Sequence, residues 1–362
     1  MNRIPALALF LALGSAQAES TLSLYGRVYL TVESVEARDE GGRSSDPLPR
    51  RSRVSDQSSL LGVRGVEEFG AGRSAFFQLE TGFRPDQDPT TFAARNSGVG
   101  LQGAWGTVVA GRWDTPFKTA TIAVDPFSDL TPGGITAALN GSGVRNVQGS
   151  FDRRDQNVVQ YWSPAFHGLA LRLSHSVNEA RTASLNPRRS GASITYAREG
   201  LYAGYAYDDL RDVGFASRVP RSQTGHAFFG TYAIGALKLG AVFEEFRRTA
   251  FSKQTAWMAN ATWSWGRHQL IYEYQKAKNG DDVDEEIVPA APRALFLPPA
   301  QPVCSVNVFA YQYAFSRRTW LLAQYVKIDN NLTATCNFGV NPLTIRGGHD
   351  PQGAAVGIRH NF

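Results

Sequence analysis

Apolar and polar side chains alternate with a period of two along several short stretches of this chain. From residue 22 to residue 33 one face is apolar and the other is polar, which is the pattern of a β-strand whose two faces have different surroundings. The same period returns over residues 61–66 and 75–80. In a soluble sheet the apolar face would cover a core, whereas in a membrane barrel it would face lipid and the polar face would line water. The apolar positions of the first stretch are Leu22, Leu24, Val28, Leu30 and Val32, and its polar positions include Ser23, Tyr25, Arg27, Tyr29 and Glu33.

Short turns and long polar connections alternate between these strand patterns. The turns fall near residues 70–72, 105–106, 163–168, 198–200, 234–235, 265–266 and 316–318, and the long connections over residues 38–53, 84–94, 178–189, 209–223, 248–253, 278–302 and 329–353. Counting the stretches between them gives sixteen strands. An even strand number with long connections at one end only is typical of outer-membrane barrels, and a β-sandwich would seldom need so many long loops. We therefore predict an all-β fold, a 16-stranded antiparallel transmembrane β-barrel.

The stretch from Thr115 to Gln156 has a different pattern from the rest of the chain. It is rich in proline and glycine and follows neither the period of a strand nor that of a helix. Connections of this length without structure of their own are usually functional or disordered. The stretch holds Asp125 and Asp129 and runs into Arg153-Arg154. We predict a constriction loop that folds inward and narrows the lumen to a charged slot.

The N-terminus has the three parts of a secretory signal peptide. A charged start at Met1-Asn2-Arg3 is followed by an apolar run from Ile4 to Leu13 and by Ala16-Gln17-Ala18. The run is too short for a membrane anchor, which needs about 20 apolar residues. We expect residues 1–18 to be cleaved as the signal peptide and residues 19–362 to form the barrel as one domain.

The overall charge and the cysteines limit the partners. The formal net charge is +5 and the sequence pI is near 9.2, which fits anionic solutes or an acidic surface. We expect no nucleic-acid partner, because the chain is exported and has no run of Lys and Arg interleaved with aromatic residues. Cys304 and Cys336 lie in two late loops, and a single pair in an oxidising compartment most often forms a disulfide.

Motifs for catalysis and for cofactors are absent. The sequence has no G-x-S-x-G, H-E-x-x-H, C-x-x-C or P-loop motif, so we expect neither an enzyme nor a cofactor. His175 and Ser176 are adjacent on a predicted strand and would point to opposite faces. The acidic cluster at residues 281–286 has three open interpretations: a divalent-cation site, a solvated loop, or a bridge to lipid phosphates through cations.

Several segments resemble the Gram-negative trimeric general porins, especially the β-proteobacterial and neisserial type. The resemblance covers the whole predicted mature chain. It is strongest in the late turn Tyr313–Thr319 and in the closing strand Val356–Phe362, which ends in an aromatic residue. The other segments similar to that family are Ser23–Gly26, Leu61–Gly70, Ala75–Phe83, Val99–Arg112 and Asp125–Phe127.

This resemblance implies a homotrimer that lets small hydrophilic solutes and anions diffuse passively across the outer membrane. The implied partners are outer-membrane lipid, lipopolysaccharide and the barrel-assembly machinery, which would recognise Phe362. In this family arginines on strands two, four and six face acidic residues of the inward loop. Arg95 and Arg154 match on strands four and six, and Asp125 matches on the loop.

The sequence departs from the family pattern at strand two, where Leu60 stands in the place of an arginine. Arg64, Arg27 or Arg112 could restore the missing charge, and Asp129 could add to the acidic side. The resulting expectation is a mild preference for anions. With Arg95 inward, strict alternation would place Gly98 and Gly100 outward against another subunit. The alternatives are a barrel enzyme resembling a lipase and a plugged barrel that acts as an adhesin or receptor.

Overall fold

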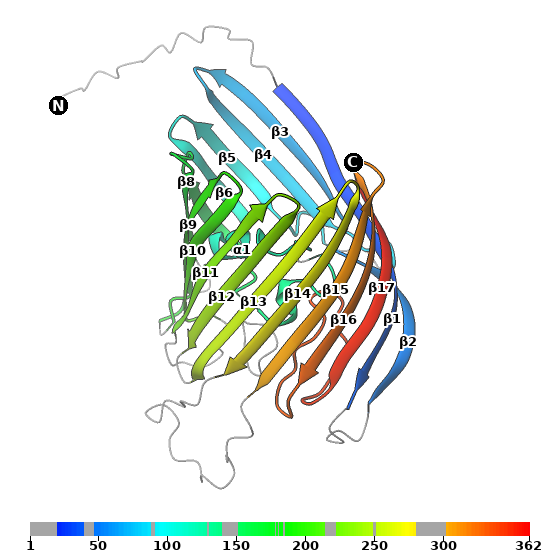
Figure 1. The fold of residues 1–362 in the computed structure, drawn as a ribbon. Helices are drawn as coiled ribbons and strands as arrows, with labels where there is room; N and C mark the ends of the chain where they lie inside the picture. Colours follow the sequence, from blue (N-terminus) through cyan, green and yellow to red (C-terminus); the bar gives the residue numbers. More distant parts are fainter. Residues whose placement is uncertain are drawn as a thin grey trace, which may run out of the picture.

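The computed structural model describes residues 20–39, 47–87, 91–128, 130–139, 151–177, 179, 181–183, 185–213, 222–248, 251–279 and 302–362. Strands make up nearly all of its regular structure (Figure 1). No helix in these ranges is long and apolar enough to cross a bilayer. The elements are β1 (Ser20–Arg38), β2 (Leu48–Asp56), β3 (Leu60–Gly70), β4 (Arg73–Gly82), β5 (Ser97–Gly103), β6 (Gly106–Asp114), α1 (Pro116–Ile122), the 3₁₀ helix η1 (Ile135–Ala137), β7 (Arg154–Trp162), β8 (Leu169–Val177), β9 (Arg188–Arg198), β10 (Leu201–Arg211), β11 (Ser222–Ile234), β12 (Leu237–Arg248), β13 (Phe251–Trp265), β14 (His268–Asn279), β15 (Val303–Ala314), β16 (Thr319–Asn330) and β17 (Asp350–Asn361).

The sheet closes on itself, because β17 pairs with β1 along residues 350–361. β3 pairs with the first part of β1 and β2 pairs with its second part. β2 and β3 are therefore two halves of one wall strand, interrupted at residues 57–59. The seventeen strand segments thus form a closed antiparallel barrel of sixteen strands, as the sequence predicts.

One predicted connection is wrong. The polar run up to Arg53 indicated a loop over residues 38–53, but β2 begins at Leu48. Arg50 and Arg53 are tolerated in this strand because they form ion pairs with Glu36 and Glu33 of the neighbouring β1, at 3.1 and 2.6 Å.

Side chains alternate between an apolar outer face and a polar inner face. Leu22 and Leu24 are 74% and 64% exposed, while Tyr25 and Arg27 on the opposite face make polar contacts inside the barrel. This is the alternation expected of a barrel with lipid outside and water inside.

The two ends of the barrel differ. Short turns and the C-terminus lie at the upper end in Figure 1, whereas β1, β14 and β16 run to the lower end, where the predicted long connections follow them in sequence. The β3–β4 turn is tight because Gly70, Ala71 and Gly72 all adopt positive φ, at 81°, 52° and 67°, and glycine reaches this region at little cost. This asymmetry places the short turns on the periplasmic side of an outer membrane.

The largest buried apolar cluster of the described residues lies inside the barrel, between its wall and the segment after β6. Helix α1 packs there against β9 and β10, and Thr115 caps its first turn by accepting a hydrogen bond from the Lys118 amide. The ring centroids of Phe117, Phe151 and Phe246 lie 4.5–6.0 Å apart. Burial of these rings holds the start of the segment on the wall.

Candidate functional site

Inward-facing amide side chains bind the segment at residues 115–139. Gln275 of β14 donates to the carbonyls of Gly133 and Gly134, both at 3.1 Å, and accepts from the Ala138 amide at 3.0 Å. Asn260 of β13 donates to the Val124 carbonyl at 3.1 Å. The segment therefore lies against the inner side of β13 and β14. Strand β7 begins at Arg154, two residues before the predicted end of the loop at residue 156.

Asp125 supports the fold of this segment. Its two carboxylate oxygens accept hydrogen bonds from the amides of Phe127 and Ile135, at 2.7 and 2.9 Å, and the residue is only 3% exposed. The structure thus brings Asp125 to the turns of the loop and not to the arginines with which the sequence grouped it. Asp129 lies outside the described residues, as does the acidic cluster at 281–286.

A second segment also folds inward, namely residues 331–349 between β16 and β17. The Gly339 amide donates to the Pro132 carbonyl at 2.9 Å, and Arg53 donates to the Asn341 carbonyl at 2.8 Å. The disulfide Cys304–Cys336 ties this segment to the start of β15, which confirms the predicted pairing. The sequence pointed to the bond but not to the inward course of the loop.

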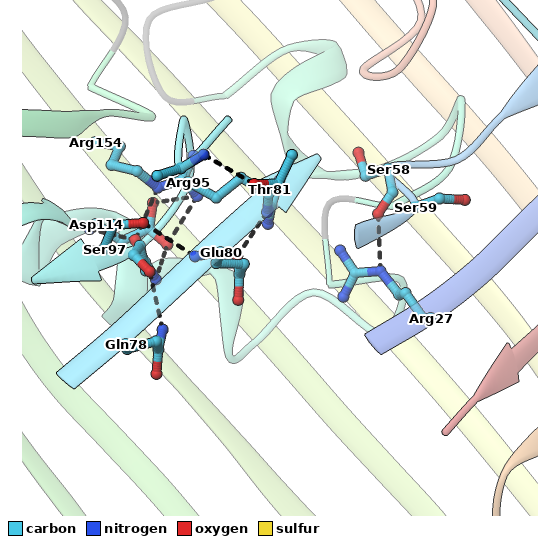
Figure 2. Close-up of polar contacts among 12 residues, drawn as sticks. Arg27, Ser58, Ser59, Gln78, Glu80, Thr81, Arg95, Ser97, Asp114 and Arg154 are labelled. Atoms are coloured by element: carbon cyan, nitrogen blue, oxygen red, sulfur yellow. Dashed lines mark hydrogen bonds and ion pairs between the residues drawn. The ribbon is translucent and has the colours of Figure 1, made fainter. Parts of the chain in front are cut away.

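Arg95 and Arg154 lie near each other in a cluster of polar side chains, to which residue 96 also belongs and which we call the polar network (Figure 2). The Arg95 Nε lies 2.6 Å from a carboxylate oxygen of Glu80. Arg154 forms an ion pair with Asp114 at 3.0 Å and donates to the Asn96 side-chain oxygen at 2.7 Å. Each of these two predicted cations therefore has a carboxylate beside it, which reduces the net field that it contributes.

Asn96 is a member of this network that sequence reasoning missed. Its side chain also bonds Asp114 through both its oxygen and its nitrogen. Residues 95 and 96 precede the start of β5. The inward and outward alternation of side chains in β5 therefore cannot be counted from Arg95. Val99 and Leu101 are the exposed residues of β5, and the outward placement predicted for Gly98 and Gly100 is therefore wrong.

Three further predicted arginines have no carboxylate partner among the described residues. Arg27 donates from Nε to the Ser58 carbonyl at 2.9 Å, and its Nη2 is buried without a partner. Arg64 lies over the Phe76 ring at 5.0 Å, and Arg64 and Arg112 each have a buried Nε without a partner. Their charges are the least compensated of the predicted set.

Arg27 also stands directly across from Leu60 in the β1–β3 register. Leu60 is 5% exposed and occupies the place where the family pattern has an arginine. A guanidinium is thus present beside that place, although it comes from the neighbouring strand.

A second ionic cluster lies where the loop returns to the wall, and the sequence did not predict it as a group. Arg153 forms ion pairs with Asp155 and Asp208, both at 3.1 Å. Lys118 forms an ion pair with Asp152 at 2.8 Å. Burial alone would lower the pKa of Arg153, but the two carboxylates outweigh it and raise that pKa. Arg153 is therefore charged at any working pH.

The C-terminal residue takes part in closing the wall. The amide of Phe362 donates to the Gly26 carbonyl at 3.1 Å, and the Gly26 amide donates to the Phe362 carbonyl at 3.2 Å. A side chain at position 26 would clash with the Phe362 ring. No group of three His, Cys, Asp or Glu side chains in the described parts of the chain could hold a metal ion.

Comparisons with known proteins agree with this architecture. A family model described as Gram-negative porin matches residues 6–333. Outer membrane porin protein 32 of Delftia acidovorans is 27% identical over 376 residues, covering 99% of this chain and 98% of that protein. Major outer membrane protein P.IA of Neisseria meningitidis serogroup C is 27% identical over 254 residues, covering 64% of this chain and 63% of that protein.

Solved structures with the same fold include two from other bacteria. A structure described as the anion-selective porin from Comamonas acidovorans has a TM-score of 0.77 at 22% identity, covering 95% of this chain and 100% of that one. OmpT of Vibrio cholerae in its trimer form has a TM-score of 0.65 at 14% identity, covering 95% and 99%. At these identities the likeness shows the closed barrel fold alone.

Proposed function

Because this chain belongs to the Gram-negative porin family, whose members are non-enzymatic channels of the outer membrane, we propose that it passes small hydrophilic solutes with a mild preference for anions. The inward segment at residues 115–139 narrows the lumen on one side. Arginines of β1, β3 and β7 line the other side, together with Arg95. Arg112 of β6 is instead directly across from Ser97, on the face where Val99 and Leu101 point outward.

The anion preference rests on one observation: Arg27 and Arg64 on the inner face have no ion pair among the described residues. Arg95 and Arg154, by contrast, are offset by Glu80 and Asp114. Charged side chains along a narrow aqueous path set which ion sign passes more easily. The description of one similar structure as an anion-selective porin supports the same direction.

Reversal potentials in planar bilayers under a salt gradient test this assignment. A unit charge about 8 Å from the ion path changes an ion's energy by about 0.5 kcal/mol in water, which is about twofold in occupancy. Substitution of Arg27 or Arg64 by Ala should therefore lower the anion-to-cation permeability ratio by about that factor.

Arg198→Ala, at the exposed last residue of β9, is the matched control and should leave the ratio unchanged. Equal ratios in the wild type and in the double variant R27A/R64A would reject the assignment. A protein that inserts but never conducts would instead favour a plugged barrel that acts as an adhesin or receptor.

We also propose a homotrimer that assembles through the outer face of β1–β5. Porins are typically trimeric, and OmpT is described in a trimer form. The apolar side chains Leu22, Val99 and Leu101 are each more than half exposed there, and a cavity of about 340 Å³ is lined in part by Leu22 and Val99. Leu22→Ala with Val99→Ala should weaken the trimer on an unheated gel. Phe228→Ala with Ile234→Ala, on the exposed face of β11, should not.

Residues 1–18 are proposed as the cleaved export signal, and Phe362 as the signal for barrel assembly. The exposed terminal ring and its place beside Gly26 support a role at closure. N-terminal sequencing of the mature protein should begin at Glu19. Deletion of Phe362 should lower the yield of assembled barrel, and an unchanged yield would contradict its role.

A further inference from the structure

A cavity of about 190 Å³ lies inside the barrel, between the inward loop and the wall formed by β15, β16, β17 and β1, which are neighbours at the right of Figure 1. It lies in the half of the barrel that carries the short turns. Its polar lining includes Tyr29, Thr131, Gln312 and Arg359. None of these residues belongs to the constriction set derived from the sequence.

The strand registers assemble the charged end of this cavity. Tyr29 of β1 is directly across from Arg359 of β17, and Arg359 is directly across from Trp320 of β16. Side chains directly opposite on one face lie about 5 Å apart at Cβ. The three residues therefore form one row on the inner face.

Arg359 is positioned without being neutralised. Its guanidinium lies over the Trp320 ring at 5.4 Å, and its Nε donates to the Asn361 side-chain oxygen at 3.0 Å. No carboxylate forms an ion pair with it in the described chain. The ring fixes the orientation of the guanidinium, and its charge is left for an anion entering the cavity.

A second guanidinium increases the positive potential beside the cavity. Arg27 lies two residues before Tyr29 on the same inner face and is a like-charged neighbour of Arg359. The hydroxyl of Tyr29 has no hydrogen-bond partner among the residues that the structure describes, although the residue is 4% exposed. A carboxylate could accept from Arg359 and from this hydroxyl.

The remaining lining residues carry apolar side chains, although most of the free surface of the cavity is polar. Phe127 of the loop and Leu322 of β16 are both 3% exposed, and Pro126 and the Trp320 ring complete the walls. Convergent polar groups beside apolar side chains are a usual composition of small-molecule sites. The volume equals that of roughly six water molecules at about 30 Å³ each, which suits a ligand with a single ring.

We propose that this cavity binds small aromatic carboxylates on the periplasmic side of the constriction. The carboxylate pairs with Arg359 and the Tyr29 hydroxyl, and the ring packs against Phe127 and Trp320. A bound ligand lies between the inward loop and the wall, so it obstructs the ion path while it stays.

Single-channel recording of the full protein with benzoate as the probe tests this site. Benzoate should produce brief blockades of the chloride current. Acetate lacks the ring, so its half-blocking concentration should be at least tenfold higher than that of benzoate. Benzyl alcohol, which lacks the charge, should not block. Arg359→Gln should raise the half-blocking benzoate concentration at least tenfold, whereas Arg359→Lys should recover part of the loss.

Arg73→Gln removes one positive charge from the same end of the barrel but outside the cavity, and it should leave the benzoate block within twofold of the wild type. Equal block by acetate and benzoate in the wild type would overturn the site even if no variant folded. Equal benzoate block in the wild type and in Arg359→Gln would do the same. The cavity and the anion preference are tested separately, because reversal potentials do not report benzoate block.

Discussion

The Asp125 carboxylate stabilises the local fold of the inward loop. Its carboxylate accepts hydrogen bonds from two loop amides and is almost fully buried. Loss of a partner for buried amides costs about 1–3 kcal/mol. Asp125→Ala should therefore loosen the inward loop and increase fluctuations of the open-channel current. Asp125→Asn keeps one accepting oxygen and should give an intermediate noise level. A quiet channel in the alanine variant would exclude a structural role for this carboxylate.

Glu80 and Asp114 partly neutralise Arg95 and Arg154 and so reduce the positive potential in the ion path. Neutralising either one removes a negative charge beside Arg95 or Arg154, so the net positive charge of the path rises. Glu80→Gln and Asp114→Asn should each raise the anion-to-cation permeability ratio by about twofold, on the same Coulomb estimate as above. Glu199→Gln also removes a carboxylate, but at an exposed turn, and it should have no effect. A fall in the ratio of either test variant would reverse the proposed sign.

Residue types alone indicated which arginines line the barrel but not how their charges are compensated. Strand parity placed Arg27 and Arg64 on the polar face, as observed. The acidic partners of these arginines come from strands distant in sequence or from bends. The alternation of inward and outward side chains along a strand does not continue across a bend. Asn96 and Asp114 therefore could not be assigned from local pattern, and neither could the burial of Asp125.

The two inward segments are the elements that shape the lumen, and the sequence predicted only one of them. The segment at residues 115–139 is recognisable by its length and its lack of strand period. The segment at 331–349 resembles any polar loop, because its inward course depends on contacts with Pro132 and Arg53. Those contacts exist only once the barrel has closed.

The Cys304–Cys336 disulfide holds the second segment in place. It closes a loop with a sequence separation of 32, for which chain entropy predicts a stabilisation of about 3–4 kcal/mol. The double variant C304S/C336S should raise single-channel conductance and current fluctuations, because residues 331–349 spend time away from the lumen. Treatment of the wild type with a reductant under denaturing conditions, followed by refolding, should reproduce this behaviour. Identical conductance in both forms would mean that the other contacts suffice to hold the loop.

At the scale of the whole molecule, closure of the barrel was the feature best predicted from sequence. Period-two alternation and the asymmetry of turns and loops follow from the membrane itself, which every strand meets in the same way. The β2–β3 interruption at residues 57–59 escaped prediction, because Arg50 and Arg53 look like loop residues until their partners on β1 are known.

Because a closed barrel encloses water, salt screens the charges of its wall, and its ion selectivity depends on the salt concentration. Screening acts over about 10 Å at 0.1 M salt and about 3 Å at 1 M. Arginines at the wall act on ions in the path across such distances, so the anion-to-cation permeability ratio should decline toward that of free solution as salt rises from 0.1 to 1 M. Selectivity that came from direct binding of an anion in a dry contact would persist at high salt. Reversal potentials measured at a fixed gradient ratio across this range separate the two cases. The double variant R27A/R64A should show a weaker dependence than the wild type, because fewer uncompensated charges remain to be screened.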